Sequence, residues 1–282
     1  MRIYIPTRGR LDKQITLRSI PDSLRPITWL MCREDEADAL RDRYGVNVAT
    51  VPARPKYRIA QKRQAIMVHA ARDGVERVLM LDDDFVFLKK GLKKDPAAKT
   101  PYSMYNQTGD DFFDMVADVA EALRDYAVVT CAERNRCHTY VPDKKGRAYN
   151  TRVNGFIACR PSIILNEGFR WDELDIMEDF NMMLNLYRAG YESAVLCDWI
   201  WGQRGVSGAA GGCSTYRDQA VQAKAVNALK ALHEDFVRVV EKETKGGWFG
   251  GKRLDCQMYW KKALASAPSI IKPERLERWD FL

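Results

Sequence analysis

The chain has 282 residues, of which 46% are hydrophobic and 29% are charged, and its formal net charge is +7 at pH 7. These values are ordinary for a globular protein of one large domain, and no apolar run is long enough to cross a membrane. Seven scattered cysteines without a Cys-x-x-Cys pair argue for reduced thiols in a cytoplasm rather than a disulfide framework.

Short apolar runs alternate with segments of helical periodicity through the first third of the chain. This alternation predicts an α/β fold with a mostly parallel central sheet flanked by helices. The predicted strands are Arg2–Pro6, 27–32, 46–51, Val78–Leu81, 127–131, 153–159 and 193–197. The predicted helices are 34–44, Ile59–Arg72, 111–126, Pro161–Asn166, a helix from 177 to Gly190, and 218–243. Residues 89–108 and 135–151 are polar and aperiodic, which predicts loops.

Three consecutive carboxylates, Asp82, Asp83 and Asp84, follow the apolar run Val78–Leu81. Such a continuous run is typical of a strand buried on both faces. Adjacent like charges repel, and ionised carboxylates are costly near a core unless a cation compensates them. Hard oxygen ligands suit Mg²⁺ or Mn²⁺, which usually also hold substrate phosphates. The triplet therefore predicts a metal–diphosphate site, with a solvated turn as the alternative.

A second acidic pair, Glu178 and Asp179, opens a predicted helix. Backbone N–H groups at a helix start keep a carboxylate ionised, and the amphipathic face that follows fixes its position by packing. Asp179 is therefore a candidate general base, because a base must be held rigidly beside the acceptor hydroxyl. An ordinary N-cap is the alternative.

Basic residues accompany both acidic motifs. Thr7, Arg8 and Arg10 follow the first strand, and Lys62 and Arg63 lie on the helix before the Asp strand. Ligands of such sheets bind at the carboxyl ends of the strands, where arginine and lysine beside a metal can hold a diphosphate. Plain surface charge is the alternative for each of them.

Two further segments are candidates for ligand contact. Residues 202–217 are rich in glycine, which permits a closing lid or a close approach of backbone to phosphate. In the predicted loop at 134–152, basic residues interleave with tyrosines, a mixture that can contact phosphates and stack bases. The basic candidates are Arg134, Arg136, Lys144, Lys145, Arg147, Arg204 and Arg217.

Cys131, Cys137 and His138 could be zinc ligands, but a fourth partner at a recognisable spacing is missing.

Taken in order, these motifs resemble the glycosyltransferase A (GT-A) fold, in which an Asp-x-Asp motif and a metal hold a nucleotide-sugar diphosphate. Within that fold the chain is similar to the TET-associated glycosyltransferases, phage and related enzymes that add sugars to hydroxymethylated pyrimidines in DNA. The resemblance rests on Ile-Pro-Thr-Arg-Gly-Arg (5–10), Ile-Ala-Gln-Lys-Arg-Gln (59–64), Leu-Asp-Asp-Asp-Phe-Val-Phe (81–87), Met-Glu-Asp-Phe-Asn-Met-Met-Leu (177–184), Arg-Ala-Gly-Tyr (188–191) and Gly-Gly-Cys-Ser-Thr-Tyr-Arg (211–217).

The resemblance implies a single domain over 1–282. Residues 1–90 would bind the nucleotide sugar, 91–217 would form the acceptor side, and 218–282 would be a C-terminal helical extension. No membrane attachment is expected, and the host cytoplasm is the expected location if a phage encodes the chain.

The resemblance also implies residue roles. Asp82 and Asp84 would be the Asp-x-Asp carboxylates, with Asp84 on the metal and Asp82 or Asp83 on the ribose or metal. Asp179, with Glu178 beside it, would be the base of an inverting enzyme. The nucleotide pocket would be lined by Thr7, Arg8, Arg10, Lys62 and Arg63.

Two motifs of related enzymes match less well. Many members of the fold place a late histidine on the metal, and His233 is the only candidate after Asp179. The Gln-x-x-Arg-Trp motif of family-2-like enzymes is reduced here to Gln203-Arg204-Gly205.

The implied reaction moves a sugar from a nucleotide diphosphate, with UDP the expected carrier, to the hydroxymethyl group of 5-hydroxymethylcytosine in DNA. The cofactor would be Mn²⁺ or Mg²⁺. The base could be reached in the duplex or flipped out. The alternatives are a polysaccharide or protein acceptor, a metal-dependent nuclease, and a catalytically silent DNA-binding module.

Overall fold

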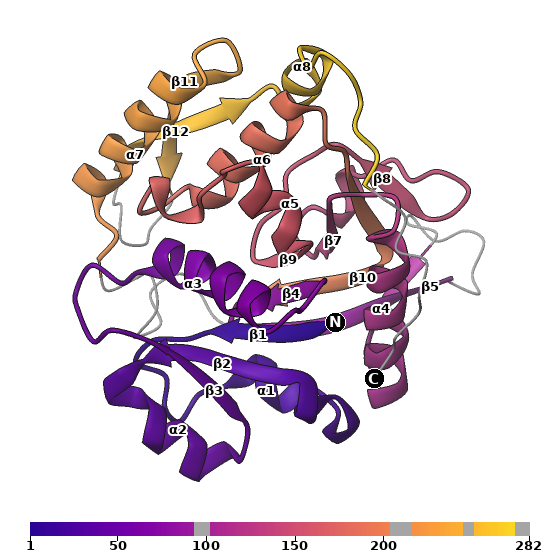
Figure 1. Ribbon diagram of the computed structural model, residues 1–282. Helices are drawn as coiled ribbons and strands as arrows, with labels where there is room; N and C mark the ends of the chain where they lie inside the picture. Colours follow the sequence, from indigo (N-terminus) through magenta and orange to yellow (C-terminus); the bar gives the residue numbers. More distant parts are fainter. Residues whose placement is uncertain (93–101, 204–215, 245–250, 274–282) are drawn as a thin grey trace.

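The structure is a computed structural model that describes residues 1–92, 102–203, 216–244 and 251–273 (Figure 1). Its centre is a ten-stranded sheet with the order β3-β2-β1-β4-β9-β7-β10-β5-β6, and β8 pairs with β10. The strands are β1 (Arg2–Pro6), β2 (Thr28–Arg33), β3 (Asn47–Val51), β4 (Val78–Leu81), β5 (Phe85–Leu92), β6 (Tyr102–Asn106), β7 (Val128–Glu133), β8 (Arg147–Tyr149), β9 (Phe156–Cys159) and β10 (Ser193–Gln203).

Most of these strands run in one direction. Parallel pairing joins β3, β2, β1 and β4, and it also joins β7 to β10. β9 lies antiparallel between β4 and β7, so that β7 and β10 point the same way as β4. The carboxyl ends of β1, β4 and β7 therefore lie along one edge of the sheet, which confirms the predicted mostly parallel α/β architecture.

Helices cover both faces of the sheet, because side chains alternate along each strand. On β1, Tyr4 faces a core shared with α3, α5 and α6, whereas Ile3 and Ile5 face a core shared with α1, α2 and α4. The helices before the C-terminal segment are α1 (Ile15–Ser19), η1 (Asp22–Ile27), η2 (Glu34–Glu36), α2 (Ala37–Tyr44), α3 (Ile59–Arg72), α4 (Gly109–Ala122), η3 (Cys137–Thr139), α5 (Pro161–Asn166), η4 (Trp171–Glu173) and α6 (Glu178–Ala189).

The C-terminal segment packs on α6. It contains α7 (Gln219–Leu232), the antiparallel hairpin β11 (Val237–Thr244) and β12 (Gly251–Met258), and α8 (Trp260–Ala265). Trp260 at the start of α8 lies edge-on to Phe180 and Tyr187 of α6, with ring centroids 5.9 and 6.0 Å apart. This packing ties the helix that begins with Glu178 and Asp179 to the last part of the chain.

The long helix predicted over 218–243 is wrong beyond Leu232. The chain turns at His233 and then forms β11, so the C-terminal segment is not purely helical. Helical periodicity alone does not reveal that Val237 to Thr244 pairs residue by residue with Gly251 to Met258.

Other boundaries also differ from the prediction. The loop predicted over 89–108 contains the end of β5 and all of β6, and the loop over 135–151 contains η3 and β8. The strand predicted over 193–197 continues as β10 to Gln203, with a register shift against β7 between Leu196 and Ile200. In each case the pairing partner is distant in sequence, and tertiary context overrides local propensity.

Within the described ranges, none of the helices combines the length and the apolar character that a membrane span requires.

Candidate active site

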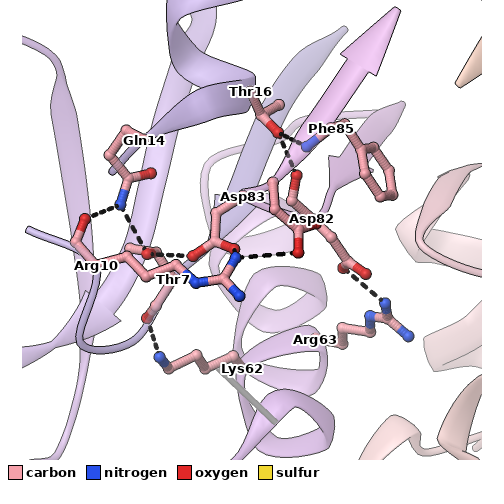
Figure 2. Close-up of polar contacts among 10 residues, drawn as sticks. Thr7, Arg10, Gln14, Thr16, Lys62, Arg63, Asp82, Asp83 and Phe85 are labelled. Atoms are coloured by element: carbon pink, nitrogen blue, oxygen red, sulfur yellow. Dashed lines mark hydrogen bonds and ion pairs between the residues drawn. The ribbon is translucent and has the colours of Figure 1, made fainter. Parts of the chain in front are cut away.

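The acidic triplet connects β4, near the middle of the sheet, to β5, which lies next to β10 on the side away from β7. The loop that follows β1 lies beside it, because β1 and β4 are parallel neighbours. In Figure 2 the side chains of Thr7 and Arg10 converge on the triplet from this loop, and Arg63 approaches Asp82 from α3. Residues predicted from three separate sequence motifs therefore meet at one edge of the sheet.

Gly155, just before β9, makes room for this connection. Its φ is +65°, and a Cβ there would lie 2.7 Å from the Phe85 ring and 3.3 Å from Asp82 Oδ2. Its carbonyl accepts the N–H of Asp82 at 3.3 Å. Phe85 in turn stacks on Trp201 of β10, with centroids 4.5 Å apart. A larger residue at 155 would displace the triplet or the rings beneath it.

Asp83 ties the triplet to the loop after β1. Its Oδ2 accepts the Thr7 hydroxyl at 2.6 Å, and its Oδ1 pairs with Arg10. Gln14, which the sequence analysis did not single out, donates to Thr7 Oγ1 at 2.8 Å and so orients that hydroxyl. Burial raises the pKa of Asp83 to about 6, against the opposing effects of Arg10 and Thr7. Both carboxylate oxygens of Asp83 are thus already engaged by protein groups.

Asp84 and Asp82 keep free coordination capacity. Asp84 Oδ2 lies 3.2 Å from Arg10, whereas Asp84 Oδ1 is buried and has no hydrogen-bond partner among the described residues. Asp82 Oδ1 accepts from Arg63 at 3.1 Å, and 28% of the Asp82 side chain is exposed. Crowding by protein atoms raises the pKa of Asp82 to about 6, and Arg63 opposes that rise.

Arg63 links the triplet to α6. Its Nη1 donates to Glu178 Oε1 at 2.6 Å while its Nη2 contacts Asp82. Burial raises the pKa of Glu178 to about 7; Arg63 lowers it, and the negative charges of Asp179 and Asp82 raise it. One guanidinium thus holds the two acidic motifs of the sequence at a common place.

Asp179, in contrast, is half-buried, and its one hydrogen bond to the described residues is local, since it accepts the Phe180 N–H at 3.0 Å. The preceding residue, Met177, has φ 63° and ψ 19°, a left-handed conformation that is strained for a side chain of this size. This residue turns the chain into α6, so that Glu178 points to Arg63. Strain at the residue before a carboxylate pair is a known mark of functional sites.

Lys62 occupies the space beneath the loop after β1. It is 2% exposed, and its ammonium donates to the Thr7 carbonyl. Burial lowers the pKa of Lys62 to about 8, and nearby Arg8 acts in the same direction. Lys62 therefore supports the backbone of the loop from below.

Arg8 has no anionic partner in the part of the chain that the structure describes. It is half-buried, its Nη1 is buried without a hydrogen bond, and no described carboxylate pairs with it. Its Cζ lies 6.0 Å from the ring centroid of Tyr216, and the Cζ of Arg58 lies 4.6 Å from the same centroid. Arg58 and Tyr216 were missed as site residues, although Tyr216 lies within the motif at 211–217.

A groove of about 670 Å³ runs along the outer side of α3, between this helix and β2 and β3. Its lining includes Tyr57, Gln61 and Asp175 near the start of α3, and His69 and Arg72 near its end. None of the candidate catalytic residues lines it, so it is separate from the triplet.

The oxygen set at the triplet fits a hard divalent cation. A buried carboxylate oxygen without a partner on Asp84 is a donor of the kind that Mg²⁺ and Mn²⁺ take, and such ions complete their coordination with water and phosphate. The described residues hold no group of three or more His, Cys, Asp or Glu placed to bind a metal. A cation here would therefore depend on the donor diphosphate for much of its coordination.

His233 does not extend this set. Its Nδ1 lies 3.1 Å from Arg188 Nη1 and its Nε2 lies 2.8 Å from Asn181 Oδ1. Because arginine only donates, Nδ1 must accept and Nε2–H must donate, so both ring nitrogens are engaged. The expectation that this histidine could bind the metal is wrong for this arrangement.

The possible zinc ligands are not assembled either. Cys131 is buried in β7, and His138 is exposed on η3.

The candidate acceptor residues are dispersed. Arg134 leaves the end of β7 and packs against Gly202, while Lys144 and Lys145 are exposed in the turn before β8. Arg217 donates to Gln222 Oε1 at 2.9 Å at the start of α7. Arg136 and Arg147 are half-buried, and Arg204 lies outside the described residues.

The sheet order, the helices on both faces and the acidic strand end define a protein of the GT-A class of nucleotide-sugar transferases. In agreement, the mannosyltransferase PcManGT from Pyrobaculum calidifontis, solved with GDP-Man and Mn²⁺, matches with a TM-score of 0.50 at 13% identity, over 82% of this chain and 62% of that one. GalNAc-T7, solved with UDP, GalNAc and Mn²⁺, matches with a TM-score of 0.46 at 8% identity, over 72% of this chain and 43% of that one. The chain thus spans less than two thirds of either structure.

The family model of the TET-associated glycosyltransferases matches residues 1–212, and the chain belongs to this family. It is therefore a glycosyltransferase. No curated protein matches the chain.

Proposed function

We propose that the enzyme transfers a sugar from a nucleoside diphosphate, UDP being the expected carrier, to the hydroxymethyl group of 5-hydroxymethylcytosine in DNA with inversion of the anomeric carbon. The family supports sugar transfer, and its name supports a substrate related to oxidised methylcytosine. The bound GDP-Man and Mn²⁺ of PcManGT support a metal-assisted nucleotide-sugar donor.

One observation carries the donor half of this proposal. Among the described residues, Asp84 Oδ1 is a buried carboxylate oxygen without a hydrogen-bond partner, and Arg8 Nη1 is a buried guanidinium nitrogen without one. An unpaired acceptor atom and an unpaired donor atom at one sheet edge are complementary to a metal–diphosphate pair. Asp84, with Asp82 beside it, would hold the cation, and Arg8 would contact the diphosphate. When bound, the metal would act as a Lewis acid that neutralises charge on the leaving diphosphate.

The remaining residues of the triplet region would position these groups. Asp83 would hold the loop after β1 through Thr7 and Arg10, rather than contact the donor, because both of its oxygens are engaged. Lys62 would support the same loop through the Thr7 carbonyl.

We assign the general base to Asp179. As a half-buried carboxylate at the start of α6 it can reach an acceptor hydroxyl, whereas Glu178 is committed to Arg63. Asp179 would take the hydroxyl proton while that oxygen attacks the anomeric carbon and the bond to the diphosphate breaks. Glu178 and Arg63 would keep α6 in register with the triplet.

The exposed Lys144 and Lys145, with Arg134 at the end of β7, would contact the DNA backbone. The test below compares duplex with single-stranded DNA.

In the decisive experiment the enzyme is incubated with Mn²⁺, one nucleotide sugar at a time, and DNA that contains 5-hydroxymethylcytosine. The DNA is supplied in duplex or in single-stranded form, and its nucleosides are then analysed by mass spectrometry. A hexose or pentose mass added only to hydroxymethylated DNA is expected. Unmodified cytosine DNA is the control. Donor binding without transfer to any DNA would instead favour a polysaccharide or protein acceptor. If the protein cleaves DNA when Mg²⁺ is the only addition, and nucleotide sugars have no effect, the result would favour a nuclease.

A further inference from the structure

The segment beyond residue 212, where the family match ends, sends one aromatic side chain back to the donor side of the site. We propose that Tyr216 is a positioning residue that packs against Arg58 and orients Arg8 for the diphosphate of the donor, so that a residue just before α7 completes the nucleotide pocket. This inference rests on the proposed donor site at Arg8.

The ring of Tyr216 contacts two arginines. Arg8 and Arg58 carry like charges, and both lie against the ring of Tyr216, at 6.0 and 4.6 Å from its centroid. The negative face of an aromatic ring attracts guanidinium groups without neutralising them. Tyr216 therefore holds two guanidinium groups close together without itself neutralising either of them.

Of the two arginines, Arg8 is the one whose charge is left for a ligand. Arg58 is already paired, because its Nη1 donates to Asp175 Oδ2 at 3.1 Å. Gln61 donates to Asp175 Oδ1, also at 3.1 Å, and accepts the Arg58 N–H at 2.9 Å, so Arg58 is fixed at the start of α3. Arg8 has no such partner among the described residues, and its buried Nη1 makes no hydrogen bond with them. The ring thus contacts one fixed arginine and orients a second one that no described carboxylate neutralises.

The residues that directly follow Tyr216 are held by hydrogen bonds. Asp218 caps α7 by accepting the Val221 N–H at 2.8 Å, and Arg217 donates to Gln222 Oε1 at 2.9 Å. Gln222 is 1% exposed and donates to the Leu254 carbonyl of β12 at 3.3 Å. Tyr216 therefore lies just before a capped helix start, and its ring packs against the hydrophobic core.

Replacement of the ring tests the proposal. In Tyr216→Leu the apolar packing is kept and the π face is removed, whereas Tyr216→Phe keeps the ring and loses only the hydroxyl. We expect Tyr216→Leu to raise the Kd for UDP or GDP with Mn²⁺, measured by calorimetry, about tenfold, which is the scale of a partly desolvated cation–π contact. The KM for the nucleotide sugar should rise in parallel while kcat changes by less than about twofold, because the acceptor side is untouched.

Two further variants keep the result interpretable. Tyr216→Phe should bind within about twofold of wild type, and Tyr259→Ala, which alters another tyrosine of the same segment without an arginine contact, should bind as wild type does. A Tyr216→Leu protein that binds as tightly as wild type, or a Tyr216→Phe protein that loses as much as Tyr216→Leu, overturns the role of the ring and leaves the proposed function standing. A wild-type protein that binds neither UDP nor GDP overturns the donor site itself, and the inference with it.

Discussion

Arg63 of α3 and Glu178 of α6 form a buried ion pair, with Nη1 and Oε1 2.6 Å apart and side chains only 3% and 7% exposed. The same guanidinium reaches Asp82 at the end of β4. This pair joins the donor-side triplet to the helix that carries the proposed base, and the rest of the proposed chemistry depends on it.

Removal of one partner should therefore be costly. Arg63→Met leaves Glu178 buried without compensation, and we expect it to lower the free energy of unfolding by about 3–5 kcal/mol. The double variant Arg63→Met with Glu178→Gln removes both charges and should recover more than half of that loss. The wild type, the two single variants and the double variant form a four-protein cycle, and urea denaturation of all four measures the coupling between Arg63 and Glu178. Equal stability of Arg63→Met and the double variant would contradict a buried pair.

Asp179→Asn should fold and bind donor as wild type does but transfer sugar at least about 100-fold more slowly, because the amide cannot accept the hydroxyl proton. Turnover on hydroxymethylated DNA and calorimetry of donor binding give the two readouts. Turnover near that of wild type would mean that another group is the base.

Asp84→Asn should lose the metal-dependent part of donor binding, since it weakens Asp84 Oδ1, a buried oxygen with no hydrogen-bond partner among the described residues. The Kd for UDP or GDP is compared with Mn²⁺ and with EDTA. In the variant the two values should coincide, whereas Asp114→Asn, an exposed change on α4, should keep the wild-type difference. An Asp84 variant with the full wild-type response to Mn²⁺ would remove this residue from the metal site.

His233 should make stability depend on pH below neutrality. Burial, followed by the charge of Arg188, lowers the pKa of His233 to about 4 from 6.5. Between these values the unfolded chain binds a proton that the folded chain does not. The stability contributed by neutral His233 is therefore full above pH 6.5 and is lost as the pH falls toward 4, by up to about 3 kcal/mol.

His233→Gln removes this titration and can still accept from Arg188 and donate to Asn181. The difference in unfolding free energy between wild type and variant, measured from pH 4.5 to 8, should shrink or reverse at the acidic end. His138→Gln, an exposed change, should leave the profile unaltered. The Mn²⁺ affinity should not change in His233→Gln, and a loss of affinity would restore this histidine as a metal ligand.

DNA binding should weaken as salt rises, because phosphate contacts release counterions. Replacing Lys144 and Lys145 together with glutamine should reduce the slope of log K against log salt by about 1–2 if both contact phosphate. Lys261→Gln, on exposed α8, is the matched control. A wild-type affinity that is flat from low to high salt would argue against this surface.

Local signals explain why several elements were predicted with their correct ends. Apolar spacing predicts α3 over Ile59–Arg72, and a four-residue apolar run predicts β4 over Val78–Leu81. In both cases the information lies within the element itself. β6 and β11 were missed because their stability comes from pairing with β5 and β12, and a sequence read locally does not contain that register.

The same division applies to the site. The sequence identified Thr7, Arg63, Asp83 and Glu178 as members of charged motifs, and the fold brings these motifs together. The sequence did not identify Gln14, which orients the Thr7 hydroxyl, because Gln14 is uncharged and belongs to no charged motif.

By itself the sequence determined the fold class, the family and the charged groups at the sheet edge, because strand ends and helix starts are local features with ordered spacing. Only the tertiary structure decided which carboxylate keeps an unpaired oxygen, which arginine lacks a partner, and that His233 is committed elsewhere. Burial and pairing depend on residues far apart in the chain. Asp82, Asp83 and Asp84 are identical as letters, and they differ only in what the fold places against them.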